Sequence, residues 1–209
     1  MPDSVSSEPF ELPLFPLQSV LFPGGLLGLK VFEARYLDLM ADCLRERRPF
    51  GVVALTQGAE VRGASKAPVV FERVGCQAEL IEADSAQTGI LHVRCRGTHR
   101  FATESTQQQD DGLWTARVTA LPDDEVVLPT EALIGSAKGL ANAIAALKAQ
   151  GTQPFLEPYQ FDSAGWLANR WCEILPISLA AKQKLMELED PLVRLQLVDE
   201  FLRGKGVVS

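Results

Sequence analysis

The sequence predicts an α+β protein in two parts, an antiparallel β-barrel domain with one helix followed by an α-helical bundle. Short apolar segments separated by turn residues fill residues 12–121, as in barrels built from many short strands. From residue 130 the apolar period becomes helical, and no strand–helix–strand rhythm occurs. We therefore expect a loosely held N-terminus at 1–11, a β domain at 12–121, a linker at 122–129 and a helical bundle at 130–209.

Proline and glycine residues mark the boundaries of the first predicted elements. Prolines favour an extended conformation in the residue before them and cannot donate to a sheet ladder, so residues 12–17 should form a short or edge strand. Pro23-Gly24 suits the central positions of a type II turn, where the second residue needs a positive φ. Residues 27–31 alternate between large apolar residues and a glycine or a lysine, which predicts a half-buried strand.

A helix should follow Phe32. Its predicted apolar face consists of Tyr36, Leu37, Met40 and Leu44. Glu33 lies in the first turn and Arg45, Arg47 and Arg48 lie at the end, an order that complements the helix dipole. Glu33 and Arg35 could be imagined as an acid–base pair, but their position at a helix start favours a cap and a structural ion pair.

The remaining strands are predicted from alternating apolar positions between polar turns. We expect them at 50–55, 67–71, 74–82, 90–96, 100–105 and 114–120, with a polar turn at 83–89 and a polar loop at 106–112. In the second part, helical stripes run from residue 130 to Gly151, through Leu167 to Leu175, from Ser178 toward Glu189, and from Asp190-Pro191 to Gly204. Asp123, Asp124 and Glu125 are interpreted as a solvated, charged hinge.

The composition is that of an ordinary globular protein, with 46% hydrophobic and 22% charged residues. A net charge of −7 is opposite in sign to that of a generic nucleic-acid binder. The chain shows no signal-peptide pattern and no apolar run of membrane-spanning length. Its four cysteines are widely spaced and are interpreted as reduced, mostly buried thiols, which suggests the cytoplasm.

Four large aromatic residues outside the regular elements are candidates for protein binding: Phe22, Phe155, Tyr159 and Phe161. Loops rarely hold such groups without packing them, so packing between the two domains is the simpler interpretation. The functional alternative is a groove between the domains for exposed apolar segments of partner proteins.

Two further constellations are weaker. Arg94, Arg96 and Arg100, near His99, could form an anion or RNA patch. Nucleic-acid binding is not expected, since interleaved aromatic residues are missing and the chain is acidic. A zinc site needs several cysteine and histidine residues close together. One region of the sequence contains both types, namely Cys76, His92, Cys95 and His99. Strand alternation places Cys95 and His92 on opposite faces, so we expect no metal site.

No catalytic set or cofactor site is predicted. Two histidines on strand surfaces give no Ser/His/Asp or Cys/His arrangement. The pattern GxxxxGK[ST], which would cradle the phosphates of ATP, is absent from the sequence.

Residues 12–36 resemble the start of the Lon protease N-terminal domain, also called the Lon substrate-binding domain. That family opens with an LPLFPL-type strand, a VLFPG turn and a strand leading into FE-x-RY, here Leu12 to Leu17, Val20 to Gly24 and Phe32 to Tyr36. Later matches are Val74-Gly75-Cys76, Arg96 to Phe101, Leu167 to Arg170, Leu175-Pro176, Lys182 to Leu185 and Val193 to Leu195.

The resemblance implies a β domain similar to the PUA-like folds, a helical bundle, and a role in recognising polypeptides or a partner protein such as a protease. The ATPase and protease parts of Lon are expected to be missing, because their motifs do not occur. The alternative is a PUA-like RNA-binding or small-ligand-binding protein. Neither the partner nor the oligomeric state can be predicted.

Overall fold

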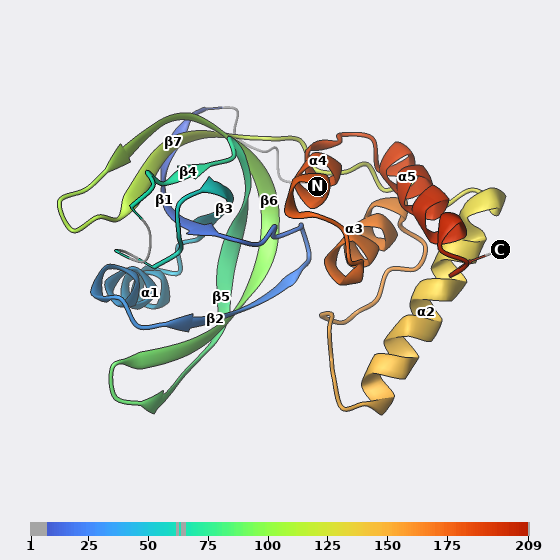
Figure 1. Ribbon diagram of the computed structural model, residues 1–209, viewed down its shortest axis with the longest axis horizontal. Coiled ribbons are helices and arrows are strands. Elements are labelled where there is room, and N and C mark those ends of the chain that lie inside the picture. The colour runs from blue at the N-terminus through green and yellow to red at the C-terminus, as the bar shows by residue number, and fades with distance from the viewer. Residues whose placement is uncertain (1–7, 62, 64–65, 209) are drawn as a thin grey trace. The chain divides into compact units, whose positions relative to one another are not determined.

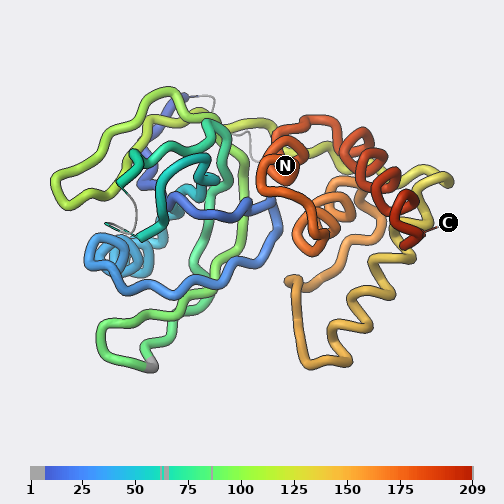
Figure 2. Tube along the Cα trace, viewed as in Figure 1, coloured from blue at the N-terminus to red at the C-terminus, as the bar shows by residue number. Residues whose placement is uncertain are grey.

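The structure, a computed structural model, describes residues 8–61, 63 and 66–208, and the side chain of residue 86 is not described. The chain divides into two compact units, residues 1–123 and 124–209. We call them the β unit and the helical unit. Figure 1 shows strands and one helix in the first and helices in the second, and Figure 2 follows the chain through both.

Seven strands and one helix make up the described part of the β unit. They are β1 (Phe10–Leu17), β2 (Leu26–Val31), α1 (Ala34–Glu46), β3 (Phe50–Gln57), β4 (Val70–Phe71), β5 (Val74–Gln87), β6 (Ile90–Gln108) and β7 (Trp114–Ala120). A flexible N-terminus was predicted at residues 1–11. Residues 1–7 of that stretch lie outside the described residues. Its end was predicted wrongly, because Phe10 and Glu11 already pair with β7.

The described strands form one mainly antiparallel sheet in the order β1-β7-β6-β5-β3-β4, with β2 paired to β6. β1 also pairs with β3 in parallel, but each partner covers only part of it, β7 along residues 10–14 and β3 along 14–17. The sheet is therefore curved. It is not the closed or nearly closed antiparallel barrel that we predicted, since β1 and β3 run parallel. The parallel pairing arises because β2 and α1 lie between β1 and β3 and return the chain in the same direction, which strand periodicity does not encode.

β5 and β6 are much longer than predicted. They continue through the expected polar turn and reverse at Thr88-Gly89, where Gly89 has a φ of 78°. β6 runs without interruption through the two strands predicted at 90–96 and 100–105. The polar residues 83–89 were interpreted as a turn because they lack apolar alternation. In a projecting hairpin both faces of the strands are solvated, so such alternation is not required.

α1 packs against the sheet through Tyr36, Leu39, Met40 and Cys43. The predicted face was wrong at Leu44, which is 51% exposed. Positions 36, 40 and 43 follow the 3.6-residue period more closely than 36, 40 and 44. These side chains share a core with residues from β1, β3, β5 and β6, including Phe15, Phe50, Cys76 and Cys95.

The predicted type II turn at Pro23-Gly24 is confirmed. Gly25 N donates to Phe22 O at 2.9 Å, and Gly24 has a φ of 73°. Gly97 of β6 bonds to this turn, donating to Gly25 O at 2.9 Å and accepting from Gly24 N at 2.8 Å. A Cβ at position 97 would lie 2.2 Å from Phe22 O, so the turn can approach β6 only because residue 97 is glycine.

The described helical unit contains a short 3-10 turn, η1 (Glu131–Leu133), and the helices α2 (Ile134–Ala149), α3 (Ala164–Ile174), α4 (Leu179–Glu187) and α5 (Pro191–Gly204). Two predicted starts are confirmed. Ser178 Oγ accepts from Ala181 N at 3.1 Å, and Asp190 Oδ1 accepts from Leu192 N at 2.8 Å, with Pro191 as the first residue of α5.

α3 is the most buried helix of this unit, with every residue from Ala164 to Cys172 buried. Its neighbours contribute buried apolar side chains, namely Leu140, Ile144, Leu195, Val198 and Leu202. The designation of these helices as a bundle stays a prediction. None of the described helices is long and apolar enough to cross a membrane.

Candidate functional site

A groove lies beside β2 in the β unit. It has a volume of about 390 Å³ and is lined by Phe15, Leu17, Ser19, residues 27–33, Tyr36, Glu60 and Val61. We call it the β2 groove. Its walls come from β1, β2, the start of α1 and the segment after β3, so it is a product of the sheet's curvature rather than of a single motif.

The floor of the β2 groove is aromatic. The rings of Phe15 and Tyr36 stack with centroids 3.8 Å apart and planes 9° apart. The Arg35 guanidinium lies over the ring of Tyr36, 4.6 Å from its centroid. Burial raises the pKa of Tyr36 to about 12, so its phenol stays neutral at physiological pH. The two neutral rings therefore give the floor an aromatic surface suited to apolar side chains.

The rim of the β2 groove exposes large apolar side chains. Phe32 is 49% exposed and Val61 is 39% exposed, while Leu27 and Leu29 are only partly buried against the core. This set was not predicted from the sequence, because Phe32 and Val61 belong to segments without periodicity and come together only through the fold. The one sequence feature that could have indicated this rim is Phe32, an aromatic residue at the end of a predicted strand and outside the predicted helix face.

The charges of the β2 groove are few. Its ionisable described residues are Lys30, Glu33, Tyr36 and Glu60. Glu33 Oε2 accepts from Arg35 Nη2 at 3.0 Å, and Arg35 Nη1 donates to Gly112 O at 2.7 Å, so the predicted structural ion pair is confirmed. The predicted cap is wrong, since the Glu33 side chain makes no cap hydrogen bond. Glu60 Oε1 accepts from Gln18 N.

The cysteines are poorly suited to nucleophilic chemistry. All four are free and buried. Burial raises the pKa of Cys43 to about 11 and those of Cys95 and Cys172 to about 12. Thiols of this kind remain protonated at neutral pH, whereas a reactive cysteine needs a lowered pKa.

The possible zinc ligands do not converge. Cys76 and Cys95 lie in the core, His92 is exposed on the opposite face of its strand, and His99 Nδ1 contacts Asp123 at 2.9 Å. In the described part of the chain, no group of three or more Cys, His, Asp or Glu residues is placed to hold a metal ion.

Three of the four predicted aromatic candidates gather in the helical unit. The rings of Phe155, Tyr159 and Phe161 contact Trp166 of α3 with centroid distances of 6.3, 5.9 and 5.4 Å. Phe155 is buried, while Tyr159 and Phe161 are partly exposed. Phe22 belongs to the β unit and is buried. A role of these residues in protein binding stays a prediction.

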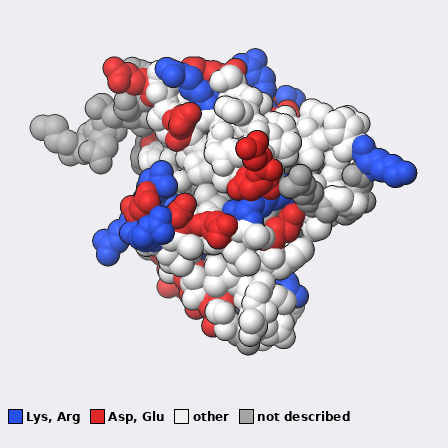
Figure 3. Space-filling view, turned by 90° about the vertical axis from the view of Figure 1, so that its left-hand side faces the viewer, with Lys and Arg blue, Asp and Glu red and all other residues white. Residues whose placement is uncertain are grey.

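The predicted basic patch is neutralised in the structure. Arg94 pairs with Glu82 at 3.0 Å and Arg96 with Glu79 at 2.8 Å, both across β5 and β6. Arg100 is only 3% exposed and donates to Pro122 O at 2.9 Å. Alternation fails between Arg96 and Arg100 because the register of β5 and β6 shifts near Gly97. Figure 3, which looks at the side of the β unit with α1, shows acidic and basic side chains intermixed.

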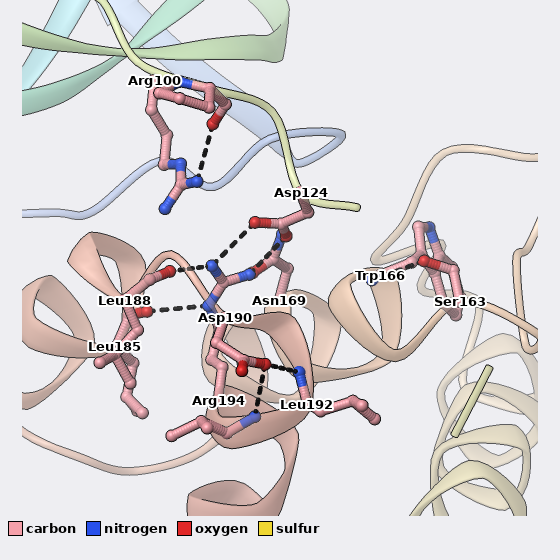
Figure 4. A network of polar contacts seen from close by, with 12 residues as sticks. Arg100, Asp124, Ser163, Trp166, Asn169, Leu185, Leu188, Asp190, Leu192 and Arg194 are labelled. Atoms are coloured by element: carbon pink, nitrogen blue, oxygen red, sulfur yellow. Dashed lines mark hydrogen bonds and ion pairs between the residues drawn. The ribbon is translucent and has the colours of Figure 1, made fainter. Parts of the chain in front are cut away.

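Buried charge in the helical unit was not predicted. Arg194 of α5 is 1% exposed. Its Nη1 lies 2.5 Å from Asp124 Oδ2 and 3.0 Å from Asn169 Oδ1, and its Nη2 lies 2.9 Å from Asp124 Oδ1. It also donates to the carbonyls of Leu185 and Leu188 (Figure 4). Arg194 therefore connects α5 with Asp124, with Asn169 of α3 and with the end of α4. The interpretation of Asp124 as a solvated hinge residue was wrong.

A second ion pair lies on α3. Arg170, which is fully buried, donates from Nη2 to Glu173 Oε1 at 2.6 Å. Burial raises the pKa of Glu173 to about 7, although the neighbouring Arg170 and Lys182 act in the opposite direction. Glu173 therefore changes charge near neutral pH inside the helical unit.

Residues 11–204 match the family described as the ATP-dependent protease La (LON) substrate-binding domain. Among curated proteins, the chain is 28% identical over 202 residues to a Lon protease of Anaeromyxobacter dehalogenans, covering 94% of this chain and 23% of that protein. It is also 28% identical over 206 residues to a Lon protease of Cytophaga hutchinsonii, covering 93% and 25%. The chain thus spans about a quarter of the length of these relatives.

Solved structures agree with this match. The crystal structure of a Lon N-terminal domain protein from Xanthomonas campestris superposes with a TM-score of 0.72 at 31% identity, covering 90% of this chain and 96% of that one. The N-terminal domain of the Mycobacterium avium complex Lon protease gives a TM-score of 0.64 at 14% identity, covering 91% and 97%, and supports the fold alone.

Proposed function

Since this chain belongs to the family of Lon substrate-binding domains, we propose that it is a non-catalytic module that binds apolar segments of polypeptides in the β2 groove. The observation that carries this proposal is the combination of an aromatic floor with the half-exposed Phe32 and Val61 on the rim. Concave apolar sites with few polar groups are typical of ligand binding, and exposed apolar side chains that are grouped commonly mark interaction surfaces.

The chemistry of the groove supports binding rather than catalysis. Its phenol has a raised pKa, and one of its two carboxylates, that of Glu33, is paired with Arg35. General acid–base catalysis needs groups whose pKa values lie near the working pH. We further propose a cytoplasmic setting, which the four free cysteines support, and unfolded segments or a partner protease as the molecules bound.

Fluorescence anisotropy with a labelled, permanently unfolded probe protein tests the proposal. Phe32→Ser should weaken binding about tenfold, because truncating a large aromatic residue that contacts the partner commonly costs more than 1 kcal/mol. Leu44→Ser is the matched control, since Leu44 is exposed to the same degree, 51% against 49%, and lies outside the groove. Equal affinity in all three proteins would refute the groove as the binding site.

A third variant separates the β2 groove from the aromatic cluster of the helical unit. If Tyr159→Ala weakened binding and Phe32→Ser did not, the polypeptide would bind at Tyr159, Phe161 and Trp166 instead. Apolar binding should also persist at high salt, whereas contacts to phosphates would be lost steeply.

A further inference from the structure

β2 is an edge strand. It pairs with β6 through six residue pairs, from Leu26 with Arg96 to Val31 with Leu91, and no other described strand pairs with it. An antiparallel partner uses the backbone N–H and C=O groups of every second residue. The remaining groups of β2 point away from β6 and form a template to which another strand can add.

Protection of this edge is slight. Proteins usually guard exposed edges with proline, a bulge or several charged side chains. β2 reads LLGLKV, with one lysine and no proline, and its register with β6 is continuous. Gly28 contributes no side chain, and a Cβ built there would meet nothing within 4 Å. Backbone atoms of a partner can therefore approach the middle of the strand closely.

The β2 groove lies along this same strand. Residues 27–31 line it, together with Phe15, Phe32 and Tyr36. Leu27 and Leu29 pack on the core but remain partly exposed, as expected for a sheet face that ends at its edge strand. A chain paired with β2 would continue this face, because side chains alternate between the two faces of a sheet. Every second side chain of the added strand would enter the groove.

We propose that the bound polypeptide adds to the free edge of β2 as an extra strand, with alternate apolar side chains in the β2 groove. This inference rests on the proposed function and specifies how that function is performed. Six residues of β2 provide an edge of about 20 Å at roughly 3.3 Å per residue. The occupant is therefore an extended segment of about six residues, without proline, whose main chain supplies affinity and whose alternate side chains supply specificity.

The charges around the edge define the occupant further. The lining of the groove carries two carboxylates, Glu33 and Glu60, and one ammonium group, Lys30. Glu33 is already paired with Arg35, so Glu60 is the carboxylate that a basic side chain of the occupant can meet. Glu60 is exposed. The segment that complements this rim is apolar at alternate positions and carries a basic side chain at an end. A second copy of this chain offers β2 itself, whose only charged residue is Lys30.

The test uses three labelled eight-residue peptides that alternate isoleucine and threonine and carry lysine at both ends. One is unmodified, and the other two are N-methylated on two amides, either at the isoleucines or at the threonines. N-methylation removes a hydrogen-bond donor, and only one set of amides faces β2 in an added strand. Methylation of that set should weaken binding at least about tenfold, while methylation of the other set should change it less than about threefold.

The outcomes separate the mode of binding from the function. If both methylated peptides bind as well as the parent and Phe32→Ser still weakens all three, the groove binds polypeptide but strand addition is refuted. If no peptide binds and the unfolded probe protein does not bind either, the proposed function fails. If the protein dimerises by sedimentation with loss of peptide binding, and Phe32→Ser restores the monomer, the edge is occupied by a second copy and the inference is overturned.

Discussion

At the scale of single residues, two adjacent aspartates have very different environments. Asp123 contacts His99 at the surface, where both side chains are about half exposed, at 52% and 48%. Asp124 makes a bidentate salt bridge with Arg194, whose side chain is 1% exposed. Exposed pairs contribute little to stability, whereas removing one partner of a buried pair leaves an uncompensated charge. The sequence offers no local sign of this difference.

Replacing Asp124 with Ala should lower the free energy of unfolding of the helical unit by about 3 kcal/mol, because Arg194 would remain buried without its carboxylate. Asp123→Ala is the matched control and should cost less than about 1 kcal/mol. Urea unfolding followed by tryptophan fluorescence measures both, since Trp166 and Trp171 lie in that unit. Equal effects of the two substitutions would show that the network does not stabilise the unit.

Glu173 should make stability depend on pH. Its folded pKa of about 7 lies above the ordinary value of 4.5, so the folded state binds this proton more tightly than the unfolded state. The stabilisation is complete below about pH 4.5 and is lost as the pH rises through about 7, by an amount on the order of 2 kcal/mol. Glu173→Gln should flatten the decline in melting temperature between pH 5 and 8, and the exposed Glu200→Gln should not.

At the scale of elements, local chemistry predicted most of the helices and strands. The turn at Pro23-Gly24 and the starts of α4 and α5 depend on side chains within a few residues, and all three were predicted correctly. The errors concern properties fixed by distant partners. These are the length of β5 and β6, the parallel pairing of β1 with β3, and the burial of Arg100 after the register shift.

Gly97→Ala should destabilise the β unit by about 2 kcal/mol or more, because its Cβ would lie 2.2 Å from Phe22 O and force the turn away from β6. Gly28→Ala is the control, since a Cβ there meets nothing within 4 Å. Thermal unfolding by circular dichroism distinguishes them. A loss of stability at position 28 as large as that at position 97 would contradict the steric explanation.

At the scale of the whole molecule, the boundary between the units falls at residues 123 and 124 rather than within a free linker. Residues 124–129 belong to the helical unit through the contacts of Asp124 and through Val127 O, which accepts from Ala164 N at 2.9 Å. The candidate site was predicted less well than the fold. The β2 groove requires residues from three separate stretches of sequence, 15–19, 27–36 and 60–61, and one-dimensional patterns do not bring such stretches together.

This boundary gives a prediction for fragments. Residues 124–209 produced alone should be helical and unfold cooperatively, whereas residues 130–209, which begin after the predicted linker, lack Asp124 and should lose much of that stability. Circular dichroism at 222 nm during urea unfolding provides the comparison. Identical curves for the two fragments would restore residues 122–129 as a linker.

The pairing of β1 has a kinetic consequence. Phe10 pairs with Val118, so the first strand of the β unit reaches its antiparallel partner only after more than 100 intervening residues are available. Closing so long a loop costs entropy before any contact forms, and folds dominated by such pairings are slow to form. The helical unit depends on nearer contacts and should fold faster. During synthesis, residues 14–17 of β1 can pair with β3 as soon as β3 emerges, whereas residues 10–13 stay unpaired until β7 emerges. In that interval Phe10 and Leu12 belong to a segment that other chains can bind.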